Sequence, residues 1–229
     1  MKIKGLQRTT LLDYPEKLAC TVFSGGCNFR CPFCHNASLV LNAEAVEEIP
    51  EEDFFSYIEK RRKMLDGVCI TGGEPLLCPD IVDFIRKIRS YGLLVKLDTN
   101  GSFPDKLEYL LDEGLVDYVA MDIKNSKEKY ALTAGLKEFP EKIERSIDLI
   151  MEKAPDYEFR TTVVRELHDI QDIANIAMRI KNAKKYFLQS YVDSGDTIAK
   201  GFSGYSAEEM LQILENTKKI LPITVLRGI

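Results

Sequence analysis

Short runs of β-branched and apolar residues alternate with helical patterns along the whole chain. In the helical segments apolar side chains recur every three or four positions, as at Ile81, Ile85 and Ile88, which is the spacing of one face of an amphipathic helix. The pattern therefore predicts β-strands separated by helices. The predicted strands are residues 20–24, 68–71, 94–99, 118–123, 158–164 and 186–191, with 223–226 as a seventh candidate.

Repeated βα units favour a parallel sheet with right-handed crossovers. Six units are fewer than a closed eightfold barrel contains, and such barrels typically need ~250 residues. An α/β fold with an open or partial barrel, or with a doubly wound sheet, is therefore expected. Both architectures bind ligands at the carboxyl ends of the strands. No linker or internal repeat divides the sequence, so we expect one domain over residues 1–229.

Composition and charge narrow the class of protein. Of 229 residues, 45% are hydrophobic and 29% are charged, as in an ordinary globular domain. The net charge of −5 disfavours a nucleic acid as the main partner, because phosphate binding needs a basic footprint. No apolar run approaches the ~18 residues of a membrane span, and the first residues lack the apolar core of a signal peptide. We therefore expect a cytoplasmic protein.

Cysteines cluster in one loop, residues 25–36. Cys27, Cys31 and Cys34 follow Gly25 and Gly26 there, and the two glycines permit close approach of a bulky group. In a cytoplasmic chain of this length, clustered cysteines indicate metal binding or catalysis rather than disulfides.

Four interpretations of this loop compete. A structural zinc site could take His35 as a fourth ligand, but the adjacent Cys34 and His35 cannot easily both point at one ion. Haem attachment would match the Cys-x-x-Cys-His order of residues 31–35, but it leaves Cys27 unexplained. A 4Fe–4S cluster is held by cysteine thiolates. With three thiolates, one iron stays open to bind and reduce a ligand, and we favour this interpretation.

The fourth interpretation is that the cysteines are buried and chemically inert, since free cysteine is among the most buried residue types. It suits Cys20 and Cys69, which lie within predicted strands, and Cys78. It does not suit a loop rich in glycine, proline and asparagine.

The spacing Cys-x3-Cys-x2-Cys, with Phe33 before the last cysteine, resembles the radical S-adenosylmethionine (SAM) enzymes. His35-Asn36 and the opening GLQRTTLLDYPEKLACTVF resemble the activating enzymes of glycyl-radical proteins, particularly the anaerobic ribonucleotide reductase activase branch related to pyruvate formate-lyase activase. The resemblance covers nearly the whole chain. It implies a partial (β/α)6 TIM-like barrel, with Cys27, Cys31 and Cys34 holding a 4Fe–4S cluster and SAM on its fourth iron.

Gly72, Gly73 and Glu74 close the second predicted strand. Two glycines can expose backbone groups to a ligand, and the carboxylate can accept hydrogen bonds from an ammonium. A plain strand-to-helix turn with a solvated glutamate is the alternative. The resemblance implies the GGE motif, which holds the amino group of SAM.

Two further strand ends carry polar residues. Asp98 and Asn100 lie where the resemblance implies a SAM contact, with Asp98 also bounding a monovalent-cation site in some members. Asp122 and Lys124 share one face of the fourth predicted strand. Charged groups pointing into a barrel mouth are costly without a ligand or partner, although a surface ion pair is the alternative. The resemblance implies that Lys124 faces the SAM carboxylate.

The last strands carry weaker candidates. Related activases use a sixth-strand histidine against SAM, whereas this chain has Gln189 and Tyr191 there. Arg160 on the fifth strand is a further candidate. His168 precedes a helix and is expected at the surface, so no histidine is assigned as a general base.

The resemblance implies that a reduced cluster passes one electron to SAM, and that the resulting 5′-deoxyadenosyl radical removes a hydrogen atom from a glycine of a partner enzyme. No catalytic side chain beyond the cluster and SAM is then required. A flavodoxin- or ferredoxin-type protein would supply the electron. The alternatives are a radical SAM enzyme acting on a small molecule, like the carboxy-deazaguanine synthases, a pyruvate formate-lyase activase, and an iron–sulfur electron-transfer module without enzymatic activity.

Overall fold

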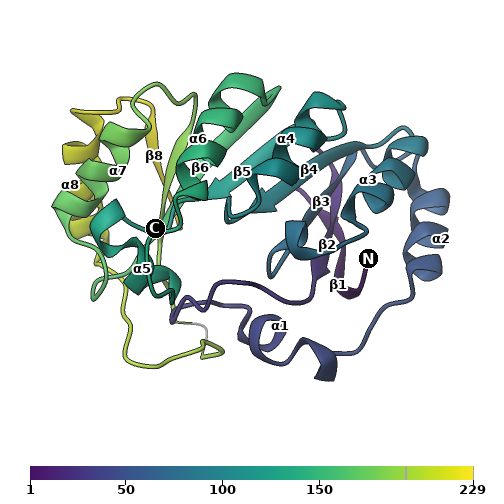
Figure 1. Cartoon of the computed structure of the whole chain (residues 1–229), viewed down its shortest axis with the longest axis horizontal. Helices are drawn as coiled ribbons and strands as arrows, with labels where there is room; N and C mark the ends of the chain where they lie inside the picture. Colours follow the sequence, from purple (N-terminus) through teal and green to yellow (C-terminus); the bar gives the residue numbers. More distant parts are fainter. Residues whose placement is uncertain (194, 229) are drawn as a thin grey trace.

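A single curved sheet forms the centre of the molecule in a computed structural model, which describes residues 1–193 and 195–228 (Figure 1). The sheet is eight-stranded, and its strands follow one another in chain order from β1 to β8. β1 is antiparallel to β2, and the other neighbouring pairs are parallel. The strands are β1 (Ile3–Thr10), β2 (Ala19–Ser24), β3 (Gly67–Gly72), β4 (Leu94–Thr99), β5 (Tyr118–Asp122), β6 (Asp156–Val163), β7 (Tyr186–Ser190) and β8 (Thr224–Arg227).

Helices surround this curved sheet; most follow one another along its outer side, and the short helix after the cysteine loop lies at its open side (Figure 1). They are α1 (Ala37–Leu41), α2 (Glu51–Arg61), α3 (Ile81–Ser90), α4 (Pro104–Asp112), α5 (Lys127–Ala134), α6 (Lys142–Lys153), α7 (Ile170–Arg179) and α8 (Ala207–Lys218), with short 3₁₀ turns η1 (Ala43–Ala45) and η2 (Pro75–Leu77). A doubly wound sheet reverses its strand order at a switch point, and this sheet does not. The predicted partial barrel is therefore confirmed.

All seven predicted strands are present within two residues of their expected ends. β1 was missed, for a physical reason. β2 is its only neighbouring strand in the sheet, apart from one isolated bridge between Ile3 and Ile49, and residues 7–9 are exposed at the edge of the sheet. An edge strand with polar exposed positions does not show the apolar pattern that identifies a buried strand.

The two faces of β5 have different surroundings, and this difference places the site. Val119, Met121 and Ile123 belong to the large apolar core. Tyr118 and Ala120 face the inside of the barrel in a small separate cluster. Because side chains alternate along a strand, the inner face continues toward the carboxyl end of β5 with Asp122, as the sequence predicted.

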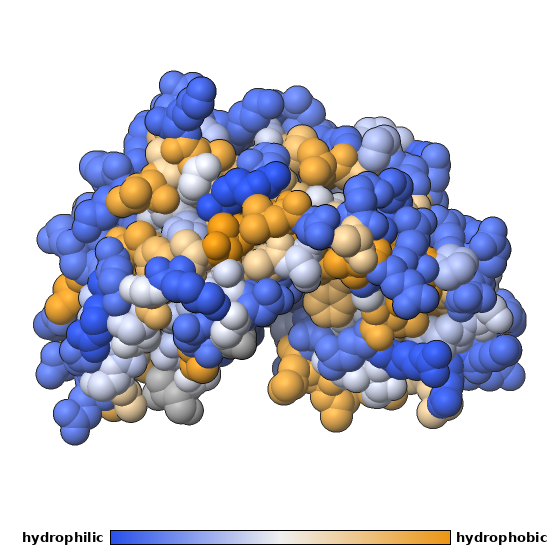
Figure 2. All heavy atoms as spheres, turned by 90° about the horizontal axis from the view of Figure 1, so that it is seen from below, coloured by the Kyte–Doolittle hydropathy of each residue, from blue (hydrophilic) through white to orange (hydrophobic). Residues whose placement is uncertain are grey.

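The view from below Figure 1 shows hydrophilic side chains over most of that face, with apolar side chains in separate groups (Figure 2). The outline in this view is hollowed between two lobes. Among the helices of the described residues, none has the length and hydrophobicity of a membrane span.

Candidate active site

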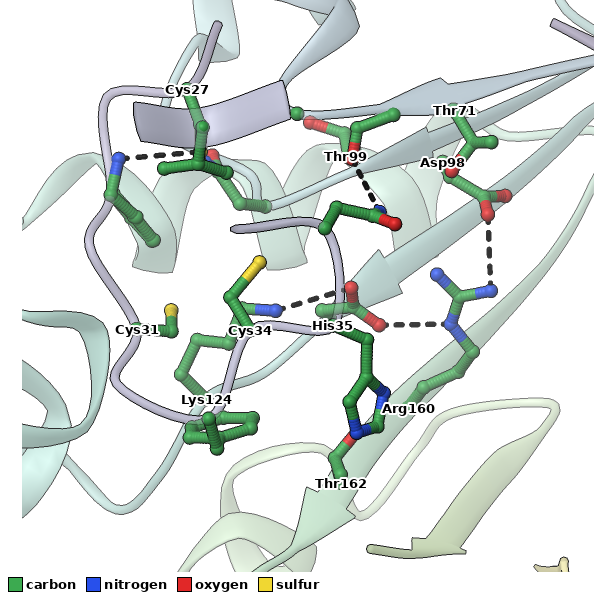
Figure 3. Close-up of a pocket in the computed structure, with 18 of the residues that line it drawn as sticks. Cys27, Cys31, Cys34, His35, Thr71, Asp98, Thr99, Lys124, Arg160 and Thr162 are labelled. Atoms are coloured by element: carbon green, nitrogen blue, oxygen red, sulfur yellow. Dashed lines mark hydrogen bonds and ion pairs between the residues drawn. The ribbon is translucent and has the colours of Figure 1, made fainter. Parts of the chain in front are cut away.

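A cavity of about 260 Å³ opens where β3 to β7 end, on the side predicted for ligand binding (Figure 3). The cysteine loop forms one wall and the strand ends form the other. Its lining residues are Cys27, Phe29, Cys31, Phe33, Cys34, His35, Asn36, Val40, Thr71, Gly72, Gly73, Asp98, Thr99, Asn100, Asp122, Lys124, Arg160, Thr162 and Gln189. Every predicted site residue except Glu74 and the weaker candidate Tyr191 therefore lines this one cavity.

The cysteine loop is tied to distant parts of the chain by its backbone. Gly26 N donates to Leu39 O at 2.8 Å, and Arg30 N donates to Ala134 O at 2.9 Å. Ala199 N, in the segment between β7 and α8, donates to Pro32 O at 2.8 Å. The loop is thus held on both flanks, and the cavity wall has a defined shape before any ligand arrives.

The three thiols of this loop are free. Burial raises the pKa of Cys31 to about 12 and also raises the pKa of Cys27, so these groups need a metal to become thiolates. Within residues 1–193 and 195–228, no three metal-ligating side chains converge on a single-ion site. Three thiols that line one cavity are the ligand set that an iron–sulfur cluster with one open iron would take.

Gly72 and Gly73 owe their identity to backbone packing. A Cβ on Gly72 would lie 2.4 Å from Ser24 N, and one on Gly73 would lie 1.9 Å from Gly26 O. Glu74 N also donates to Gly26 O at 2.9 Å. The glycines therefore let the end of β3 lie directly against the start of the cysteine loop, a reason the sequence did not reveal.

Glu74 does not line the cavity, contrary to the expectation that its carboxylate faces a ligand. It is fully buried, and Oε1 accepts from Thr99 Oγ1 at 2.8 Å and from Leu76 N at 3.1 Å. Oε2 accepts from Asn100 N at 2.6 Å. Burial raises its pKa to about 7 despite these hydrogen bonds. The carboxylate thus joins the end of β3 to the end of β4.

A chain of alternating charges crosses the inner face of the barrel at the cavity. Arg160 donates to Asp122 Oδ1 at 2.9 Å and to Asp98 Oδ2 at 3.2 Å (Figure 3). Lys124 Nζ lies 3.2 Å from Asp122 Oδ2, and the buried Lys96 pairs with Asp98 Oδ1. Each of the four carboxylate oxygens therefore faces a cationic side chain.

These pairs fix the charge states of the site. Burial alone would raise the pKa of Asp122, but Arg160 and Lys124 outweigh it and hold the pKa well below its usual range. Burial opposes the charge of Lys124, but Asp122 and Cys31 raise its pKa above the ordinary value. Lys124 therefore stays an ammonium across the physiological range, able to bind a carboxylate.

Asn100 connects the end of β4 to the cysteine loop. Its Nδ2 donates to Asn28 Oδ1 at 3.0 Å and lies 3.8 Å from Cys27 Sγ. Its Oδ1 accepts from Ser102 N and Oγ. This amide is thus oriented by its neighbours, as a residue contacting a cluster or its ligand requires.

Aromatic rings close the other end of the cavity. Phe33 packs edge-on against Tyr191, with ring centroids 6.3 Å apart. His35 stacks on the same ring at 5.3 Å. Its imidazole is therefore held by Tyr191, and Gln189, two residues before Tyr191, lies at the cavity wall.

The remaining cysteines lie outside the cavity lining. Cys20 and Cys69 are fully buried, as predicted. Cys78 is partly buried and packs against the core. Cys69 Sγ lies 3.7 Å from Lys96 Nζ, on the inner face of the barrel.

His168 is the clearest error of the sequence analysis, which placed it at the surface. It is 2% exposed, and Nε2 lies 2.8 Å from Lys124 O. Thr71 and Thr162, which line the cavity, were also missed. Each lies at or near the carboxyl end of a predicted strand, so a rule that collects the polar residues there would have found both.

The residues of this cavity fit a 4Fe–4S cluster with an amino-acid ligand. Three unpaired thiols lie on one wall, while Lys124 and the backbone of Gly72 and Gly73 lie on the other. An ammonium suits a carboxylate, and backbone carbonyls suit an amine. The donor set therefore matches both ends of the methionine part of SAM.

Comparison with known proteins agrees with this chemistry. Residues 21–177 match the model of the radical SAM superfamily. A Methanocaldococcus jannaschii protein that carries the name of a glycyl-radical enzyme activating enzyme is 32% identical over 99% of this chain and 96% of its own. The pyruvate formate-lyase-activating enzyme of Clostridium pasteurianum is 27% identical over 83% of this chain and 82% of its own.

Among solved structures, a domain of the pyruvate-formate lyase-activating enzyme from Bacteroides vulgatus has a similar fold, with a TM-score of 0.57 at 18% identity. The match covers 71% of this chain and 99% of that domain. At this identity the likeness concerns the fold.

Proposed function

Because this chain belongs to the radical SAM superfamily, and within it to the glycyl-radical enzyme activating enzymes, we propose that it removes a hydrogen atom from a glycine of a partner enzyme. Anaerobic ribonucleotide reductase is the partner we expect, on the sequence features of that branch. The chain is an enzyme, as its relatives are. The relative in M. jannaschii supports an activase over nearly the whole length.

One observation carries the proposal: Cys27, Cys31, Cys34 and Lys124 line the same cavity. The family implies a 4Fe–4S cluster and SAM, and the three thiolates would hold the cluster. Bound together, the cluster and SAM would supply the one-electron reductive chemistry that the hydrogen abstraction needs.

The chain's own side chains would bind and orient SAM. The Lys124 ammonium would pair with the carboxylate of the methionine part, and the backbone of Gly72 and Gly73 would face its amino group. Phe33 would contact the adenine, with Gln189 at the same wall. These residues lie on different elements, so the bound molecule would be fixed at several points.

Asp98, Asp122 and Asn100 would complete the polar wall. A monovalent cation at Asp98 stays a prediction. Lys96 and Arg160 already occupy the carboxylate oxygens of Asp98, so such an ion would have to share them. A one-electron carrier of the flavodoxin or ferredoxin type is the expected donor.

Isotope transfer tests the function directly. The reconstituted enzyme is incubated without oxygen, with dithionite and SAM, and with a candidate partner in which glycine carries deuterium at its α-carbon. We expect a glycyl-radical signal on anaerobic ribonucleotide reductase and deuterium in the 5′-deoxyadenosine. Deuterium transfer from pyruvate formate-lyase instead would reassign the partner.

A small-molecule substrate remains the alternative for the same cavity. An enzyme with a small-molecule substrate would form 5′-deoxyadenosine that acquires no deuterium from either glycyl-radical protein. SAM cleavage with unlabelled nucleoside in the presence of both protein candidates would favour it over the activase. An electron-transfer module would show neither cleavage nor SAM binding.

A further inference from the structure

His168 lies beneath the cavity, at the junction of three segments. It closes a turn after β6, where its backbone N donates to Val164 O at 2.9 Å. Its imidazole Nε2 lies 2.8 Å from Lys124 O, just beyond the end of β5. Its own carbonyl accepts from Tyr205 Oη, just before α8, at 2.6 Å. One residue therefore links β5, β6 and the chain beyond β7.

The contacts of the imidazole define its protonation state. Lys124 O can only accept, so Nε2 must carry a proton and donate. Nδ1 lies 3.1 Å from Val164 N and 3.2 Å from Val164 O, and in the Nε2–H tautomer it accepts from Val164 N. Burial lowers the pKa of His168, although the backbone contacts oppose this effect. The net lowering favours the neutral ring, and the contact of Nε2 with Lys124 O selects its Nε2–H tautomer.

Charged groups near the ring are few. Asp172 raises the pKa of His168 and Lys129 lowers it. These two side chains pair with each other at 2.6 Å, so their effects on the ring largely oppose one another. The backbone hydrogen bond to Lys124 is thus the main directed contact of Nε2.

Lys124 lies two residues beyond Asp122, the last residue of β5, where the hydrogen-bond ladder of the sheet has ended. The preceding Ile123 N still donates to Arg160 O at 2.8 Å. Beyond it, the carbonyl of Lys124 points to His168 while its side chain lines the cavity. Fixing that carbonyl fixes the backbone from which the ammonium extends.

We propose that His168 is a positioning residue, which holds the main chain of Lys124 so that its ammonium faces the carboxylate of bound SAM. This inference rests on the proposed function, because Lys124 has that role only in a SAM site. His168 itself touches no ligand, since it does not line the cavity.

Two substitutions separate positioning from simple stability. His168→Gln keeps an N–H donor within reach of Lys124 O, whereas His168→Leu removes it. Ile176→Ala, in the buried face of α7, is the matched control for lost stability. We expect the dissociation constant of SAM for the reconstituted enzyme to rise at least tenfold in His168→Leu, and to stay within threefold of wild type in the other two.

A SAM affinity in His168→Leu equal to that of wild type would overturn the proposal. So would a loss in His168→Leu that Ile176→Ala matches at equal thermal stability. If wild type itself binds no SAM, the proposed function fails first, and the role of His168 toward a ligand fails with it.

NMR spectroscopy can detect the hydrogen bond from His168 to Lys124 O without measuring enzyme turnover. The chain has 2 histidines, so His35→Gln leaves His168 as the single imidazole for ¹⁵N-histidine NMR of the reconstituted, oxidised full-length protein. We expect the neutral Nε2–H tautomer, with protonation only below the ordinary pKa of about 6.5. A mixture of tautomers that titrates at the ordinary pKa would contradict the proposed hydrogen bond.

Discussion

Arg160 Nε lies 2.9 Å from Asp122 Oδ1, so the cation in β6 is bonded to the carboxylate that ends β5. A second nitrogen of the same guanidinium, Nη1, lies 3.2 Å from Asp98 Oδ2 at the end of β4. Three neighbouring strand ends therefore share one cation. This arrangement leaves Lys124 charged at the cavity and sets the electrostatics of the whole polar wall.

Replacing Arg160 tests this arrangement. Arg160→Gln would leave two largely buried carboxylates without their shared cation, and removing one partner of a buried ion pair costs about 3–5 kcal/mol. We expect the free energy of unfolding in urea to fall by about 3 kcal/mol. Arg160→Lys keeps the positive charge but cannot donate from two nitrogens to both carboxylates, so its free energy of unfolding should fall by less. Equal stability of wild type and Arg160→Gln would show that the pairs contribute nothing.

Glu74 predicts a pH dependence of stability. Its folded pKa of about 7 lies above the ordinary value of 4.5, so between these values the folded state binds more protons than the unfolded state. Stability from this group is therefore present below pH 4.5 and is lost as pH rises through 7, by about 2–3 kcal/mol. Urea unfolding at pH 5 and pH 8 measures it. Glu74→Gln should lose this pH dependence, and an unchanged slope would contradict the assignment.

Tyr191 should control how well the cysteine loop retains its cluster. Its ring packs on both Phe33 and His35, and such aromatic pairs contribute about 0.5–1.5 kcal/mol each beyond burial. We expect Tyr191→Ala to retain iron and sulfide poorly after reconstitution and gel filtration. Tyr191→Phe keeps the ring and should match wild type. Poor retention in both variants would instead implicate the hydroxyl.

Gly73 should tolerate no side chain. A Cβ there would lie 1.9 Å from Gly26 O, so Gly73→Ala must displace the start of the cysteine loop. We expect it to lower the free energy of unfolding by about 3 kcal/mol, as overpacking does, and to reduce cluster content. Gly114→Ala is the control: its surroundings are open, and its left-handed backbone costs about 1 kcal/mol. Equal effects of the two would refute the steric argument.

The sequence predicted the parallel strands and most of the cavity because both depend on local patterns. Buried strands show as apolar runs, and Asp98, Asp122 and Lys124 stand out as polar residues where such runs end. Lys96 could have been predicted in the same way, because it lies two residues before Asp98 and therefore points to the same inner face of the sheet.

Contacts between distant segments could not be predicted in this way. The buried ring of His168 contacts Lys124 O and Val164 N. Both partners are backbone atoms, so no residue pattern near His168 predicts these contacts. The same holds for Glu74, whose partners come partly from β4. The residue type of Glu74 suggested a contact with a ligand, but in the structure its carboxylate points away from the cavity and into the protein interior.

The central claim is that the cavity thiols support reductive cleavage of SAM, and nucleoside formation tests it most directly. The enzyme is reconstituted without oxygen, reduced with dithionite, given SAM, and assayed for 5′-deoxyadenosine. Cys31→Ala removes a cavity thiol, while Cys78→Ala removes one outside the cavity lining. The account predicts nucleoside from wild type and Cys78→Ala and none from Cys31→Ala. An intact, reducible cluster in the wild type that forms no nucleoside would contradict it.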